Sequence, residues 1–128
     1  MITRESDYAI RVVDYLKREN SGDGVVSVKE ISDSVLIPYR FARKIIGQLA
    51  DAEILISIRG KNGGVRINPV HSVITAYDVV SVIDPKSLIL NRCIAEPGSC
   101  IRSCECSVHQ KLLAAQIKFE NLFKSLEL

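Results

Sequence analysis

Apolar residues recur every three or four positions near the start of the chain, which is the spacing of one buried helical face. The stripe consists of Ala9, Val12, Val13 and Leu16. It predicts a first helix from about residue 3 to about residue 18. The segment NSGDG that follows is rich in turn-forming residues and predicts the end of this helix.

Two further helices are predicted in the next part of the chain. Ser27 and Glu30 have the spacing of a capping box, in which each side chain bonds the other residue's backbone amide. Pro38 suits the first position of the following helix, because the amide hydrogen that proline lacks would be unsatisfied there anyway. This third helix, over about residues 38–52, has one apolar face and one face rich in arginine and lysine.

The period changes to two where Ile54, Ile56 and Ile58 alternate with other side chains, as along a β-strand. The glycine-rich turn GKNGG and the segment VRIN complete a predicted β-hairpin with basic residues at its tip and root. A further helix begins after Thr75, which is spaced to form a capping box with Asp78, and it ends near DP at 84–85.

The last helix, from about residue 107 to about residue 126, has the most regular pattern in the chain. Its apolar residues are alternately four and three positions apart, as along the seam of a coiled coil. The seam consists of Val108, Leu112, Ala115, Phe119, Leu122 and Leu126. Such a seam packs either within one chain or on a second copy, and we favour a two-fold dimer.

The order of these elements predicts a mainly α fold with a small β-hairpin, in which a winged helix-turn-helix domain precedes a long C-terminal dimerisation helix. We place the DNA-binding domain at residues 1–84, a cysteine-rich loop at 85–106 and the dimerisation helix at 107–128. No internal repeat or low-complexity segment is found in the sequence.

Basic residues are concentrated in the segment 38–66, which holds six of them against two acidic residues in a chain of net charge +2. Such a cluster favours contact with nucleic-acid phosphates, although a solvated helix face would look the same. In a winged helix, the third helix enters the major groove and the hairpin follows the backbone or the minor groove. We therefore predict DNA contacts from Ser27, Tyr39, Arg40, Arg43, Lys44, Arg59, Lys61 and Asn62.

All four cysteines fall in one stretch, CIAEPGSCIRSCECSVH, which also ends in one of the two histidines. No secretory leader or membrane span is found, so we expect a cytoplasmic chain with reduced thiols and no membrane partner. Cys104 and Cys106 are also too close in sequence for an ordinary disulfide with each other. A metal or redox role is favoured, and the spacing alone allows an iron–sulfur cluster, a structural zinc site or a metal-free thiol switch.

The sequence lacks the patterns of an enzyme. The GKNGG segment lies in a hairpin rather than between a strand and a helix, so it is not a phosphate-binding loop. The pair Cys104 and Cys106 is a CxC, not the CxxC of a thiol oxidoreductase. We predict a protein without catalytic activity and without a small-molecule substrate.

These segments together resemble the Rrf2 family of bacterial transcription regulators. The resemblance covers essentially the whole chain and rests on ITRESDYAIRVV, VSVKEIS, IPYRFARKIIGQLADAEILIS, the wing RGKNGGVRIN, ITAYDVV and the cysteine loop. It implies a homodimer, acting as a repressor, in which each winged domain binds half of a palindromic operator. It also implies an iron–sulfur cluster in the cysteine loop that changes DNA affinity with redox state, nitric oxide or cluster supply.

The family pattern has three cysteines five residues apart, sometimes followed by a histidine three positions later. Cys100, Cys106 and His109 keep these offsets, whereas Cys93 lies one residue too far away and Cys104 is additional. The resemblance therefore implies a two-iron or four-iron cluster on Cys93, Cys100 and Cys106, with Cys104 as an alternative ligand.

The fourth ligand of such a cluster is either Asp7 or His109. Asp7 lies in a DYA motif that resembles family members with a carboxylate ligand, and we favour it on that resemblance. Asp7 and Arg11 are also spaced for an ordinary ion pair along one helix, which is the alternative role of this carboxylate.

Overall fold

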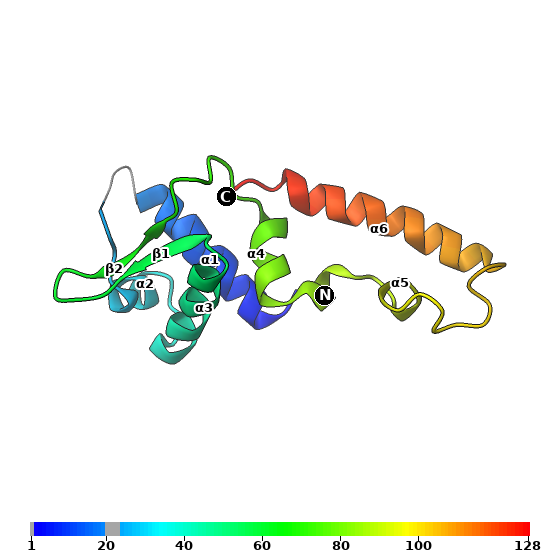
Figure 1. Cartoon of the computed structure of the whole chain (residues 1–128), viewed down its shortest axis with the longest axis horizontal. Coiled ribbons are helices and arrows are strands. Elements are labelled where there is room, and N and C mark those ends of the chain that lie inside the picture. The colour runs from blue at the N-terminus through cyan, green and yellow to red at the C-terminus, as the bar shows by residue number, and fades with distance from the viewer. Residues whose placement is uncertain (1, 20–23) are drawn as a thin grey trace.

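The computed structural model describes residues 2–19 and 24–128, so most of the predicted turn NSGDG lies outside the described residues. The elements are α1 (Arg4–Glu19), α2 (Val28–Ser34), α3 (Tyr39–Asp51), β1 (Leu55–Ile58), β2 (Gly64–Ile67), α4 (Ala76–Ile83), η1 (Pro85–Leu88), α5 (Arg92–Ala95) and α6 (Ser107–Ser125). The mainly helical fold with its antiparallel β1–β2 hairpin confirms the predicted winged helix-turn-helix with a long C-terminal helix. Figure 1 shows α1, α2, α3 and the hairpin on one side of α4, with α5 and α6 extending away on the other.

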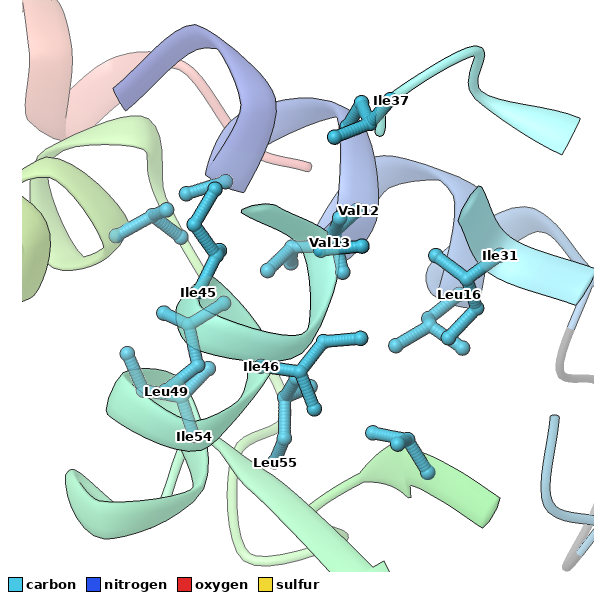
Figure 2. Packing of buried hydrophobic residues seen from close by; sticks show 14 of the residues in the cluster. Val12, Val13, Leu16, Ile31, Ile37, Ile45, Ile46, Leu49, Ile54 and Leu55 are labelled. Carbon is cyan, nitrogen blue, oxygen red and sulfur yellow. The ribbon is translucent and has the colours of Figure 1, made fainter. Parts of the chain in front are cut away.

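The main hydrophobic core lies between α1, α2 and α3. The predicted stripe of α1 is fully buried in it: Ala9, Val12, Val13 and Leu16. Ile45 and Leu49 of α3 pack against this stripe, and Ile31 of α2 lies beside Leu16 (Figure 2). Burial of each leucine or isoleucine contributes about 1.5–3 kcal/mol, so this cluster fixes α3 against α1 and leaves the opposite face of α3 in solvent.

The turn between α2 and α3 is closed by hydrogen bonds. The hydroxyl of Ser32 donates to the carbonyl of Ile37 at 2.7 Å, and the amide of Ile37 donates to the carbonyl of Ser32 at 3.0 Å. Leu36 has a φ of 56°, in the left-handed region, which reverses the chain. Pro38 is the N-cap of α3 rather than its first helical residue, one position from the prediction.

The start of α2 shows half of the predicted capping box. The hydroxyl of Ser27 accepts a hydrogen bond from the amide of Glu30 at 3.1 Å. The reciprocal bond from Glu30 is not found among the described residues. At α4 the box is complete, because Thr75 and Asp78 exchange backbone-to-side-chain bonds of 2.8 and 3.2 Å.

The wing pairs Leu55 with Ile67 and Ile58 with Gly64, and an isolated bridge joins Val26 to β2. Gly64 has no room for a side chain, because a Cβ there would lie 2.6 Å from the carbonyl oxygen of Val26. The alternating pattern predicts the strand but not its burial, since Leu55 is buried and Ile58 is 42% exposed. Burial falls along the strand from Leu55 to Ile58, because β1 leaves the core toward the tip of the wing.

The predicted seam of α6 is only partly covered within one chain. Gln116 and Phe123 form the buried face, and Phe119 packs beside them on a second core formed by Ala76, Val80, Leu88 and Phe123. Val108 and Leu122 on the seam are each 58% exposed. Beyond α6, the carbonyl of Leu126 accepts a hydrogen bond of 2.8 Å from the amide of Ala76, the first residue of α4. The amide of Leu128 donates to the carbonyl of Ile74 at 2.9 Å.

Candidate functional site

A groove of about 740 Å³ lies between the start of α2, the start of α3 and the wing. Half of the eight predicted DNA contacts line it: Ser27, Tyr39, Arg43 and Arg59. These residues come from three elements that the core holds together, and two of the four carry a positive charge. The groove therefore presents hydroxyl donors and cations on one surface, which suits contact with phosphate oxygens.

The local structure leaves these groups available. The oxygen of Ser27 caps α2, which leaves its hydroxyl hydrogen free to donate to a phosphate. Tyr39 is half exposed at the first turn of α3, and Arg43 lies one turn later on the same exposed side. The first turn of a helix also carries free amides and the positive end of the helix dipole, which favour an anion there.

The other four predicted DNA contacts lie outside this groove. Arg40 is exposed on α3 and its guanidinium lies over the ring of Phe41, 5.6 Å from the ring centre. Lys44 forms an ion pair with Glu5 of α1 at 3.0 Å. Lys61 and Asn62 are exposed in the turn at the tip of the wing.

The cysteine loop lies at the far end of α6 from the winged domain (Figure 1). The Nδ1 atom of His109 is 3.2 Å from the Sγ of Cys93, so these two predicted ligands are in contact. Cys106 is the N-cap of α6, and its Sγ accepts a hydrogen bond from the amide of His109 at 3.4 Å. His109 thus connects two of the predicted cysteine ligands, one through its ring and one through its backbone.

Cys100 and Cys104 are more exposed than the other two cysteines. All four lie in the described part of the chain and each is a free thiol. Cys104 faces a cleft of about 430 Å³ that Cys93 and His109 also line, whereas Cys100 does not line it. The extra cysteine therefore shares a cleft with two of the predicted ligands.

Asp7 does not join the cysteines within one chain. Its carboxylate accepts two bonds from the Nε of Arg11, at 3.0 and 3.2 Å, which is the ion pair that the spacing allows. Figure 1 shows the first turns of α1 beside α4, well apart from the cysteine loop.

Two residues that position the loop were not predicted from the sequence. Gln116 is 6% exposed, donates to the carbonyl of Leu88 at 2.7 Å and accepts from the amide of Leu90 at 2.9 Å. Asn91 caps α5 and its amide nitrogen lies 3.6 Å from the Sγ of Cys93. The stretch LLAAQI, in which Gln116 interrupts a run of apolar residues, was the sequence feature that could have indicated it.

The donor set fits an iron–sulfur cluster in its chemistry, because thiolates are the ligands of such clusters and an imidazole can replace one of them. Among the described residues, however, no three such donors lie close enough together to hold one metal ion. A single chain thus supplies suitable ligands and brings two of them, Cys93 and His109, into contact.

The family comparison decides the identity of the chain. Residues 2–128 match the model of the Rrf2 family, described as iron-dependent transcriptional regulators. The chain belongs to the Rrf2 family. Members are transcription regulators rather than enzymes, in agreement with the prediction, and DNA is their partner.

One relative of this Rrf2 protein agrees with that assignment, and two solved structures share its fold. The HTH-type transcriptional regulator NsrR of Bacillus licheniformis is 29% identical over 111 residues, which cover 87% of this chain and 77% of NsrR. The structure of T. potens IscR has a TM-score of 0.71 at 20% identity. The match covers 99% of this chain and 82% of the IscR chain. The structure of CymR, the global cysteine regulator of B. subtilis, has a TM-score of 0.71 at 18% identity. The match covers 99% of this chain and 92% of the CymR chain. No helix in the described ranges is long and apolar enough to cross a membrane.

Proposed function

We propose that this Rrf2-family regulator is a repressor whose affinity for DNA is controlled by an iron–sulfur cluster in its cysteine loop. The observation that carries the proposal is the contact between Cys93 and His109, with Cys106 capping α6 beside them. Soft ligands from a loop and from a helix start are held together at one end of α6, whose other end packs on α4.

In this proposal Cys93, Cys100 and Cys106 hold the cluster, and Asp7 or His109 supplies the fourth ligand. When bound, the cluster would supply an iron centre that responds to oxidation, nitric oxide or cluster shortage. An oxygen or nitrogen ligand among thiolates leaves a more exchangeable position on iron than a fourth cysteine does. The contact of His109 with Cys93 supports His109, while the resemblance of the DYA motif supports Asp7 supplied across a homodimer.

The protein acts as a homodimer in this proposal, with the exposed part of the α6 seam as the contact. Val108 and Leu122 remain largely exposed in one chain, and a second copy of α6 would cover them. The division into a DNA-binding domain (1–84), a cluster-binding loop (85–106) and a dimerisation helix (107–128) belongs to the same proposal. Two winged domains related by a two-fold axis would bind the halves of a palindromic operator.

DNA contact is assigned to the groove between α2, α3 and the wing. Arg43 and Arg59 supply charge there, and Ser27 and Tyr39 supply hydroxyl donors. Arg40, Lys61 and Asn62 would extend the contact along α3 and the wing tip. Because phosphate contacts release bound cations, affinity should fall steeply as salt rises.

The experiment is to purify the protein without oxygen and to measure iron, acid-labile sulfide and zinc together with the visible absorption spectrum. Iron and sulfide in matching amounts, with visible charge-transfer bands, would support the cluster, and their ratio to protein would indicate two or four irons. Zinc alone would favour a structural site. No metal even after reconstitution would favour a metal-free thiol switch, and either result would overturn cluster control.

A further inference from the structure

The basic face of α3 has two flanks with different surroundings. Tyr39 and Arg43 lie on the flank that lines the groove beside the wing. Lys44 lies on the other flank, next to α1, where its Nζ is 3.0 Å from the Oε1 of Glu5. Both side chains of this pair are partly exposed, at 54% and 39%.

The pair of Lys44 and Glu5 differs from other ion pairs of the described residues. Five others join positions four apart along the chain, such as Arg11 with Asp7 and Lys29 with Asp33. The pair of Lys44 and Glu5 joins two helices and cancels a positive charge on the helix that faces DNA. An exposed pair of this kind contributes little to folding stability, so its main effect is on the charge that DNA meets.

We infer that Glu5 limits the sequence-independent, electrostatic part of DNA affinity, because it neutralises Lys44 at the edge of the DNA-facing surface. This inference rests on the proposed placement of α3 against DNA. Cations that meet phosphates strengthen binding to every sequence equally, whereas base contacts favour one sequence. A carboxylate that cancels one such cation therefore lowers affinity for all sequences by about the same factor and reduces the salt dependence of binding.

The test is to measure binding of a short random-sequence duplex between about 50 and 200 mM salt. For Glu5→Gln, one additional phosphate contact should steepen the slope of log K against log salt by about 0.9. Affinity of this variant should then fall about 3.5-fold more than that of the wild type over this salt range. The double variant Glu5→Gln with Lys44→Gln should have the wild-type slope, because it removes both charges together.

Two controls isolate the cause. Glu96→Gln neutralises the acidic partner of Arg92 on α5, remote from α3 in Figure 1, and should leave the slope unchanged. Arg43→Ala reports whether α3 contacts DNA at all and should weaken binding. Circular dichroism melts confirm that each variant is folded.

The possible results separate this inference from the proposed function. If Glu5→Gln matches the wild type while Arg43→Ala weakens binding, the role of Glu5 is wrong and α3 remains the DNA-binding helix. If the double variant has a shallower slope than the wild type, Lys44 contacts phosphate despite Glu5, and the inference is overturned. If Arg43→Ala also binds as the wild type does, the proposed DNA surface is wrong, and the role of Glu5 with it.

Discussion

The winged half of the molecule and the arm formed by residues 89–125 are both mainly helical, but they differ in how many apolar contacts stabilise them. In the winged half, α1 and α3 bury continuous apolar faces around one core. In the arm, α6 is the longest helix, yet only Gln116 and Phe123 are buried along it. The winged half is fixed by many apolar contacts, whereas the arm depends on a few contacts near the end of α6.

This difference corresponds to a division of labour. The proposed DNA-binding surface needs Arg43 and Arg59 at fixed positions, which a packed core provides. The proposed cluster-binding arm needs to respond to its ligands, and regions with few buried contacts respond most readily. We therefore expect changes at the cysteines to alter the arm first and to reach the winged half through the packing of α6 on α4 and on Ile10 of α1.

The largest effect is expected from Leu16→Ala in the core of the winged half. Removal of this fully buried side chain should lower the free energy of unfolding by about 2–5 kcal/mol, measured by urea denaturation. Leu36→Ala is the matched control, because Leu36 is 87% exposed and its truncation should change stability by less than about 0.5 kcal/mol. Equal effects of the two would show that the winged half is not the packed region.

A smaller loss is expected in the arm from Gln116→Ala. The carbonyl of Leu88 and the amide of Leu90 would lose their partners, at a cost of about 1–3 kcal/mol. Hydrogen exchange should become faster at the amide of Leu90 and remain unchanged in α1. Gln110→Ala, at an exposed position of the same helix, should change neither the stability nor the exchange rate at Leu90. Similar behaviour of both variants would contradict this role of Gln116.

Two arginines, Arg43 in the winged half and Arg92 in the arm, test which half of the molecule contacts DNA. Arg43→Ala in the groove should reduce the slope of log K against log salt on a random duplex by about 1. Arg92→Ala, on the arm and paired with Glu96, should leave DNA binding unchanged in a fluorescence anisotropy titration. Equal losses would mean that the arm contacts DNA as well.

The smallest effect on stability is expected from Asp7→Asn. The lost ion pair with Arg11 should cost about 0.2–0.5 kcal/mol, the same as Asp14→Asn, which breaks a similar pair with Arg18. In anaerobically reconstituted protein, iron retention should fall in Asp7→Asn and not in Asp14→Asn if Asp7 is a ligand. Equal retention would leave His109 as the fourth ligand.

Much of the fold could be predicted from the sequence because the features that define it are local. The stripe of α1, the cap at Thr75 and the glycine-rich wing all depend on residues within about one or two helical turns of one another. The cysteine loop was found in the same way, since its four thiols are close in sequence. Burial along β1 was not predicted, because it depends on how far the core extends beneath the hairpin.

The sequence by itself therefore determined α1 to α4 and α6, the wing, the family and the set of candidate ligands, but not the short helices η1 and α5 inside the predicted loop. Only the tertiary structure decided which predicted residues share a surface: Ser27, Tyr39, Arg43 and Arg59 line one groove, while Lys44 is paired with Glu5, 39 positions away. It also decided that Gln116 holds the carbonyl of Leu88, 28 positions earlier. The reason is physical: periodicity and capping involve neighbours in the chain, whereas these contacts join distant segments that only the packed core brings together.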